Sequence, residues 1–304
     1  MTEPNTEKKK RKFSLLDNLI VIPIIGYLLI VLGQILGGVL VGVLTGLLPG
    51  VFSTDAGITS QLYLGFLGIW ILTLLVFALI PRNRPMLKAL GTKTKGNTPK
   101  MFAVGLGIGL GMNLLCALIA MINGDIDLTF HAFRPVSFLL VFIAVLIQSA
   151  AEELICRVFI YQRLVRRYGK PLMAAVVNAA FFAMIHLSNP GVTGMAIANI
   201  FIYGLLFSAM VVYMDSPWAA MAAHAGWNFC QNILLGLPNS GMVLPYSVFK
   251  LDAAAASDSF AYSVSFGLEG TITACVTLFA VAGVIVWWGT RNKVVPTNIW
   301  DAEI

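Results

Sequence analysis

Long apolar stretches separated by short polar segments dominate this 304-residue sequence. A helix needs roughly 20 apolar residues to cross the hydrocarbon core of a bilayer. Eight stretches meet or approach this length, namely residues 19–48, 60–80, 101–122, 136–162, 171–188, 194–214, 217–237 and 267–290. Helices satisfy their backbone hydrogen bonds internally, as the bilayer requires. We therefore predict an all-α fold, a polytopic transmembrane helical bundle of about eight spans in the cell membrane.

The composition excludes a soluble globular protein. Only 11% of the residues are charged, against roughly 25% in soluble domains, and the mean hydropathy is +0.85. The net charge of +6 would suit a nucleic-acid partner, but the basic residues lie in short blocks between the apolar stretches. Such blocks are typical of membrane topology, so we predict the lipid bilayer as a partner and no nucleic acid.

The basic blocks also predict the orientation of the bundle. Seventeen of the 20 Lys and Arg residues fall in the run 8–12, the loops 81–100 and 163–170, and the tail 291–304. Lys and Arg in short loops stay on the cytoplasmic side. We therefore predict a basic cytoplasmic N-terminus over residues 1–18, a single transmembrane domain over 19–290, and a cytoplasmic tail over 291–304.

Glycines recur every four residues in the first and third apolar stretches. They form the runs Gly38-x3-Gly42-x3-Gly46, Gly105-x3-Gly109 and Gly107-x3-Gly111. Small residues at this spacing share one helix face and allow helices in lipid to approach closely. We interpret all three runs as packing faces.

Ionisable side chains inside the spans are costly, at roughly 2.5 to 3.5 kcal/mol each at the bilayer centre, and mark functional sites. The span 136–162 contains Glu152, Glu153 and Arg157. Glu153 and Arg157 are four residues apart, so we predict an ion pair between them. Glu152 lies about 100° further round the helix, without a partner. It is the strongest candidate functional residue in this span.

Two of the three histidines also lie inside spans. His186 follows Phe182 by four residues, so the Phe182 ring is expected to pack against the imidazole. His224 precedes Asn228 at the same spacing. With a rise of ~1.5 Å per residue, Glu152, His186, His224 and Asn228 all lie about 11 to 22 Å from the cytoplasmic ends of their spans. They can therefore converge on one intramembrane cavity.

Two chemistries suit this set of side chains. A desolvated Glu152 can act as a general base toward water, with one imidazole orienting the water and the other, together with Asn228, stabilising an oxyanion. Alternatively, Glu152, His186 and His224 form a His2Glu set that suits Zn2+ or another divalent metal, with a position open for water. The residue types do not separate the two.

These residues resemble the CAAX prenyl protease and bacteriocin-processing (CPBP, or Abi) intramembrane proteases. That family carries EExxxR, FxxxH and HxxxN/D motifs on successive helices. Here the motifs read Glu152-Glu153-x3-Arg157, Phe182-x3-His186 and His224-x3-Asn228, within a core of residues 136–237. Cys156 and Val158 depart from the aromatic and glycine that often flank the motif arginine in the family.

The resemblance implies an intramembrane endopeptidase that cleaves a membrane-associated peptide or protein. It implies that Glu152 activates water with His186, that His224 and Asn228 stabilise the oxyanion or bind a metal, and that Glu153, Arg157 and Phe182 support them. Two alternatives remain open: a non-catalytic bacteriocin-immunity or partner-binding scaffold, and a proton-coupled transporter. Glu269, at the start of the last span, is interpreted as an interfacial residue.

Overall fold

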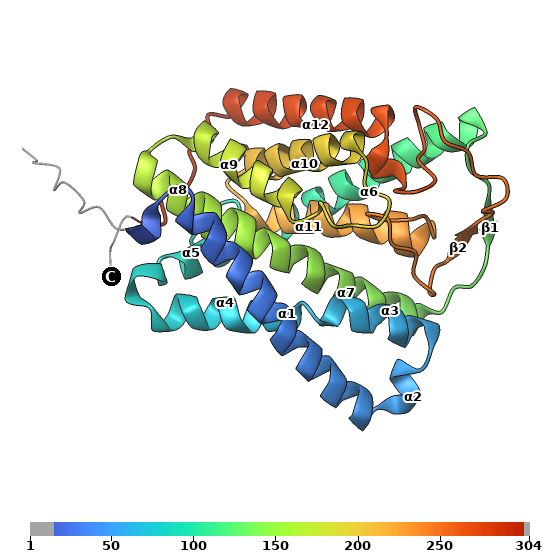
Figure 1. The fold of residues 1–304 in the computed structure, drawn as a ribbon. Helices are drawn as coiled ribbons and strands as arrows, with labels where there is room; N and C mark the ends of the chain where they lie inside the picture. Colours follow the sequence, from blue (N-terminus) through green and yellow to red (C-terminus); the bar gives the residue numbers. More distant parts are fainter. Residues whose placement is uncertain (1–14, 301–304) are drawn as a thin grey trace, which may run out of the picture.

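A computed structural model describes residues 15–300 and shows a bundle of helices (Figure 1). The basic run 8–12 and the last four residues of the tail lie outside the described residues. The α-helices are α1 (Val21–Leu47), α2 (Pro49–Phe52), α3 (Asp55–Leu64), α4 (Leu67–Leu79), α5 (Met86–Leu90), α6 (Pro99–Asn123), α7 (Pro135–Glu153), α8 (Tyr161–Tyr168), α9 (Pro171–Met184), α10 (Gly194–Tyr213), α11 (Pro217–Asn228) and α12 (Ile272–Arg291). The only strands in this part of the chain, β1 (Leu128–Phe130) and β2 (Phe249–Leu251), pair antiparallel.

The bundle confirms a multi-pass, all-α membrane protein. Among the described residues, six helical segments are long and apolar enough to cross a membrane: 21–47, 55–79, 99–123, 135–168, 194–213 and 272–291. The other two predicted spans are helical but shorter. Helix α9 has 14 residues, and α11 has 12 before it continues as a π-helix over Phe229–Leu234.

Segments that are distant in sequence meet at one end of the bundle, on the left of Figure 1. Asp17 forms ion pairs with Arg82 and Arg163 there. The guanidinium of Arg166 lies over the ring of Trp300, 4.2 Å from its centroid. Three of the described basic segments thus gather at one end, as the topology prediction requires. Which end faces the cytoplasm stays a prediction.

The glycine runs are only partly packing faces. A Cβ atom at Gly105 or Gly109 would overlap the backbone of Ala219 or Ala223, so these glycines let α6 and α11 touch. By contrast, a Cβ atom at each glycine of the other two runs would have no described atom within 4 Å: Gly38, Gly42, Gly46, Gly107 and Gly111. For these runs the packing interpretation is wrong, because they face outward from the bundle.

Two π-helical segments follow the motif residues directly. Helix α7 ends at Glu153 and continues as a π-helix over Leu154–Ile160, all of it buried. The π-helix Phe229–Leu234 begins one residue after Asn228. A π-helical turn is wider than an α-helical one and occurs often at functional sites. Both helices therefore change geometry where they carry their polar side chains.

Candidate active site

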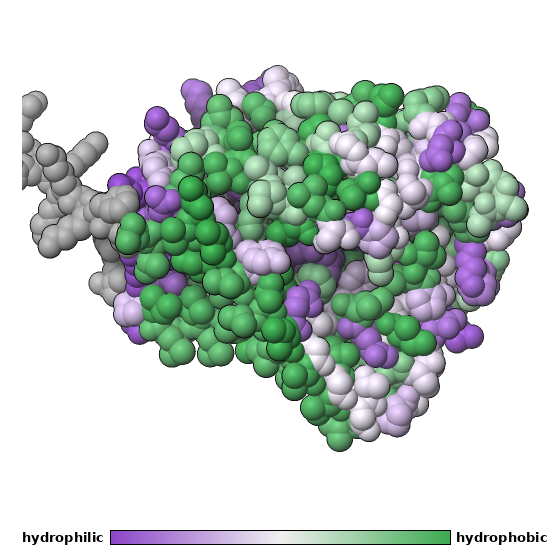
Figure 2. Space-filling view, in the orientation of Figure 1, coloured by the Kyte–Doolittle hydropathy of each residue, from purple (hydrophilic) through white to green (hydrophobic). Residues whose placement is uncertain are grey.

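A cavity of about 380 Å³ lies inside the bundle, and helices α1, α3, α7, α9, α10 and α11 contribute to its walls. All four predicted catalytic residues line it: Glu152, His186, His224 and Asn228. Figure 2 shows the hollow, with hydrophilic residues inside it, on a face that is otherwise largely hydrophobic. The structure therefore brings together side chains from three separate helical segments, as their estimated depths predict.

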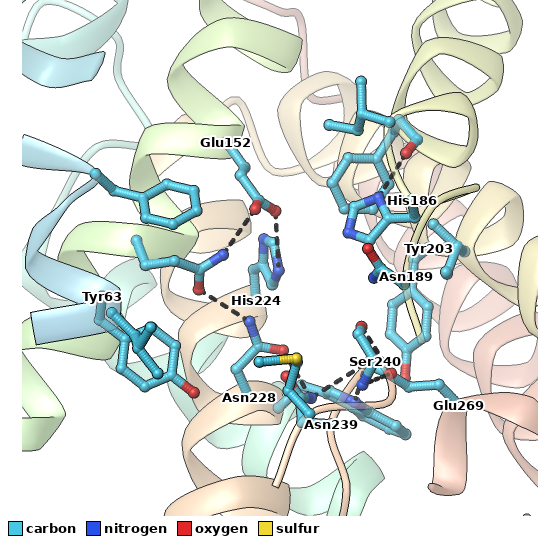
Figure 3. A pocket seen from close by; sticks show the side chains of 18 of the residues that line it. Tyr63, Glu152, His186, Asn189, Tyr203, His224, Asn228, Asn239, Ser240 and Glu269 are labelled. Carbon is cyan, nitrogen blue, oxygen red and sulfur yellow. Dashed lines mark hydrogen bonds and ion pairs between the residues drawn. The ribbon is translucent and has the colours of Figure 1, made fainter. Parts of the chain in front are cut away.

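Glu152 has one carboxylate oxygen held and one free. Gln148 donates its Nε2 hydrogen to Glu152 Oε1 at 2.7 Å. Glu152 Oε2 is buried and accepts no hydrogen bond from any described residue. It lies 3.7 Å from His224 Nε2 (Figure 3). A carboxylate oxygen in this position is available to a small polar molecule in the cavity.

His224 is held by the second glutamate. Its Nδ1 donates to Glu153 Oε1 at 3.0 Å, which turns Nε2 toward Glu152. Arg157 donates from Nη1 to the same Glu153 oxygen at 3.0 Å, confirming the predicted ion pair. Spacing along one helix could not reveal that Glu153 also orients an imidazole on α11.

Buried ionisable groups gather around His224. Glu152 and Glu153 supply two carboxylates, and Arg157 supplies one guanidinium. Burying charged groups is costly unless each is paired and hydrogen-bonded, so these groups depend on one another for their stability.

Arg157 is completely buried, and aromatic rings cover it. Its guanidinium carbon lies 4.8 Å from the ring centroid of Phe182 and 5.2 Å from that of Phe207. Nη2 donates to the Gly204 carbonyl at 3.1 Å. Phe207 also stacks on His224, with centroids 5.2 Å apart. Cation–π contacts and hydrogen bonds together compensate for the lost hydration of the guanidinium.

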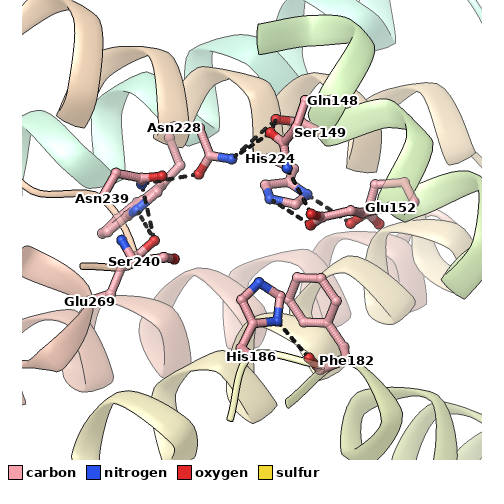
Figure 4. A network of polar contacts seen from close by, with 12 residues as sticks. Gln148, Ser149, Glu152, Phe182, His186, His224, Asn228, Asn239, Ser240 and Glu269 are labelled. Atoms are coloured by element: carbon pink, nitrogen blue, oxygen red, sulfur yellow. Dashed lines mark hydrogen bonds and ion pairs between the residues drawn. The ribbon is translucent and has the colours of Figure 1, made fainter. Parts of the chain in front are cut away.

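His186 lies just beyond the end of α9, and its tautomer follows from its one hydrogen bond. Nδ1 lies 2.7 Å from the carbonyl oxygen of Phe182. A carbonyl only accepts, so Nδ1 carries the hydrogen, and Nε2 of the neutral ring is an acceptor that faces the cavity (Figure 4). The Phe182 ring packs edge-on against the imidazole at 4.8 Å, as predicted.

Asn228 belongs to a polar network that the motifs only partly predict. Its Nδ2 donates to Gln148 Oε1 and to Ser149 Oγ, both at 3.2 Å. Its Oδ1 accepts a hydrogen bond from Asn239 Nδ2 at 3.2 Å. Asn239 lies in the loop after the π-helix Phe229–Leu234, outside every motif, so sequence reasoning missed it.

Glu269 is buried rather than interfacial, which corrects the interpretation of its position. Its side chain lines the cavity and accepts hydrogen bonds from Trp227, Asn239 and Ser240. It precedes α12, outside the six candidate spans. Burial raises the pKa of Glu269 to about 7, and the hydrogen bonds from Ser240 act in the opposite direction. In the sequence, the one indication that Glu269 belongs to the site is its position as an isolated acidic residue at the start of an apolar stretch.

The predicted metal ligands Glu152, His186 and His224 border the same cavity. Within residues 15–300, no three His, Cys, Asp or Glu side chains lie in an arrangement that would hold a metal ion. Both imidazoles use Nδ1 for a hydrogen bond, to Glu153 and to the Phe182 carbonyl, which leaves Nε2 as the free ring nitrogen. Metal-binding histidines are commonly held in this way, so a metal at this site stays a prediction.

A match to a protein family covers the helices that carry the three motifs. Residues 134–230 match the family model described as Type II CAAX prenyl endopeptidase Rce1-like. This segment is therefore similar to that family. It extends from the residue before α7 into the π-helix after α11 and includes Glu152, His186, His224 and Asn228. No curated protein and no solved structure matches the chain.

The Rce1-like match confirms the resemblance to the CPBP proteases on about a third of the chain. It implies a protease and supports a CAAX-type intramembrane endopeptidase as the general activity. A peptide substrate and a lipid bilayer as surroundings follow from the same family and from the apolar helices.

Proposed function

We propose that this protein is an intramembrane endopeptidase that uses water activated by Glu152, without a metal, to hydrolyse a membrane-associated peptide or protein. One observation carries the proposal. Glu152 Oε2 is buried without a hydrogen-bond partner among the described residues, in the cavity that His186, His224 and Asn228 also line. An acceptor of this kind is what a general base toward water requires.

In the first step, a water molecule lies between Glu152 and His186. It donates one hydrogen to Glu152 Oε2 and the other to His186 Nε2, the acceptor atom of that ring. The water oxygen attacks the carbonyl carbon of the scissile bond while Glu152 takes the proton. Attack forms a tetrahedral intermediate with a negatively charged oxygen.

His224 and Asn228 lie where they can stabilise that oxygen. His224 Nδ1 stays bonded to Glu153, so donation from Nε2 to the oxyanion requires the imidazolium form of His224 in this mechanism. Asn228 Nδ2 donates to Gln148 and Ser149, and the oxyanion would replace one of these acceptors. As the intermediate collapses, the C–N bond breaks and Glu152 returns its proton to the leaving amine. Preorganised donors of this kind are typically worth ~10²- to 10³-fold in rate.

The surroundings of the cavity favour a substrate held at the membrane. Its walls include the apolar side chains Ile30 on α1 and Leu62 on α3, together with Phe66 between α3 and α4. The hollow opens on a hydrophobic face of the bundle (Figure 2). Together with the family, this supports a prenylated peptide with a CAAX terminus as the first substrate to test.

The test is cleavage of a farnesylated CAAX peptide by the purified protein, beside the same peptide without its farnesyl group. We expect cleavage by the wild type with and without a chelator, and none by Glu152→Gln or His186→Ala. Asp127→Asn, which makes the same type of change at an exposed position outside the cavity, serves as the matched control. Full cleavage by Glu152→Gln would refute the mechanism, and loss of cleavage with chelator would favour the metal-bound alternative.

Two other functions have distinct outcomes in the same preparation. Proton-coupled flux into liposomes that depends on Glu152, without cleavage, would indicate a transporter. Binding of a peptide that survives Glu152→Gln, again without cleavage, would indicate a scaffold or an immunity protein.

A further inference from the structure

A continuous chain of hydrogen bonds joins the two glutamates of the cavity wall (Figures 3 and 4). Gln148 donates to Glu152 at 2.7 Å, and Asn228 donates to Gln148 at 3.2 Å. Asn239 then donates from Nδ2 both to Asn228 Oδ1 and to Glu269 Oε1, each at 3.2 Å. Three primary amides thus lie in series between two carboxyl groups.

Both ends of this chain set its direction. An ionised Glu152 can only accept, so Gln148 presents its NH2 group to Glu152 and its Oε1 to Asn228. A primary amide can be turned over with little change in shape, which exchanges its donor for its acceptor. An ionised Glu269 can only accept, so Asn239 must present its NH2 group to it. The same NH2 group then faces Asn228 Oδ1, which leaves the NH2 of Asn228 toward Gln148.

We propose that Glu269 is a positioning residue that, together with Glu152 at the opposite end, fixes the direction of this amide chain and so holds the NH2 group of Asn228 toward the reacting carbonyl. The inference rests on the proposed function, in which Asn228 donates to the oxyanion. With Glu269 neutral, Asn239 can turn over and bring its carbonyl oxygen against Asn228 Oδ1, so Asn228 keeps its NH2 group toward Gln148 only against that repulsion. The donor that the oxyanion needs is then no longer held in place.

The surroundings of Glu269 hold it as an acceptor. Its Oε2 accepts hydrogen bonds from the backbone N–H of Ser240 at 2.6 Å and from Ser240 Oγ at 2.9 Å, and Trp227 Nε1 donates to Oε1 at 3.2 Å. Ser240 has a φ of +49°, a conformation that costs free energy for a residue with a side chain. Asn199 donates to the backbone carbonyls of Glu269 and Thr271, both at 2.8 Å, which fixes the segment from outside the cavity.

Titration of Glu269 should therefore appear in the rate. Burial raises its pKa to about 7, so protonation occurs near neutral pH and removes the acceptor that orients Asn239. The titratable groups that interact with it are His224 on α11, Tyr203 on α10 and Tyr63 on α3. Activity should rise with pH through about 7, because only the ionised carboxyl holds Asn239, and through it Asn228, in the productive orientation.

The principal variant is Glu269→Gln, assayed with the farnesylated CAAX peptide. A glutamine places an NH2 group against either Ser240 or Asn239, both of which donate. We expect kcat to fall about 10- to 100-fold, below the full loss for an oxyanion donor, with KM changed less than about 3-fold. The rise of kcat near pH 7 should disappear. Glu269→Asp retains an acceptor and should recover part of kcat.

A double-mutant cycle separates positioning from a general loss of structure. If Glu269 acts through Asn239, then Glu269→Gln should have little further effect on kcat in an Asn239→Ala background. Asn199→Ala is the structural control, because it loosens the same segment but keeps the carboxylate. It should lower thermal stability and leave the pH dependence of kcat in place. Additive losses in the cycle, or an unchanged kcat in Glu269→Gln, would overturn the proposal.

A readout without substrate distinguishes this inference from the proposed function. In protein labelled with ¹⁵N-asparagine, the side-chain amide NMR signals of Asn228 and Asn239, assigned with Asn239→Ala and Asn228→Ala, should shift with pH near 7. Those shifts should be absent in Glu269→Gln. Failure of the wild type to cleave peptides, with these shifts present, would refute the peptidase alone. Signals that respond identically in wild type and Glu269→Gln would refute the positioning role.

Discussion

Arg157 is the cation on which the buried part of the site depends, and removing it tests how the site is held together. The guanidinium has no exposed surface, and its Nη1 lies 3.0 Å from Glu153 Oε1. At an effective dielectric constant of about 20, two unit charges at that distance attract by about 5.5 kcal/mol. Breaking a buried pair by removing one partner typically costs ~3 to 5 kcal/mol, because the other charge remains unpaired.

Arg157→Met is expected to leave Glu153 with one donor, His224, and with two aromatic rings where the guanidinium was. The variant should lose about 3 to 5 kcal/mol of stability, measured as a shift of thermal or denaturant unfolding in detergent. The double variant Glu153→Leu with Arg157→Met removes both charges. Its stability should return most of the way to that of the wild type, since apolar replacements of buried pairs are often neutral.

In the double variant, activity should stay low although stability recovers. In the double variant His224 Nδ1 has lost its carboxylate acceptor, so the orientation of Nε2 toward Glu152 is no longer imposed. We therefore expect the double variant to be stable but at least about 10-fold slower in peptide cleavage, the factor that ~1.4 kcal/mol of lost transition-state stabilisation produces. Wild-type stability in Arg157→Met, or wild-type activity in the double variant, would refute this reasoning.

Three further outcomes follow from the packing and the charges. Gly109→Ala should destabilise the contact of α6 with α11 by about 1 to 3 kcal/mol, whereas Gly107→Ala, which points into open space, should not, as thermal unfolding of the two will show. The free energy of unfolding of the wild type should fall by about 3 kcal/mol between pH 4.5 and 7 and level off above pH 7. The reason is that Glu269 keeps its proton to a higher pH in the folded state than in the unfolded state. Glu269→Gln should abolish this pH dependence when unfolding is measured across the same range. Phe182→Leu should lower kcat more than stability in a side-by-side assay, because the ring contacts Arg157, His186 and His224.

The sequence predicts where the helices are better than where they end. Apolar length places all eight segments, yet α9 has 14 residues and the α-helical part of α11 only 12. Both helices stop being α-helical beside the cavity, where His186 and Asn228 lie. A hydropathy window counts apolar residues and does not detect a helix end inside the bundle. Backbone without α-helical bonds is tolerated at that depth where it borders a polar cavity.

The motifs predict the members of the site, and the contacts between them come only from packing. Spacing of four residues places Glu153 beside Arg157 and Phe182 beside His186, and both pairs are present. It contains no information on contacts between helices, so the bond from His224 to Glu153 could not be derived. Asn239 and Glu269 belong to no periodic pattern.

The bilayer itself explains why the polar residues converge. An ionisable group inside an apolar bundle has no water to bond with, so its cost falls only when another protein group meets it. Glu152, His186, His224 and Glu269 line one cavity, and Glu153 and Arg157 contact it through His224 and Phe182. In a chain with 11% charged residues, such partners are few. Because partners are scarce, residues from distant helices gather in one cluster. Within it, Glu152 Oε2 borders the cavity without a hydrogen-bond partner among the described residues, which is the position that the proposed mechanism gives to the attacking water.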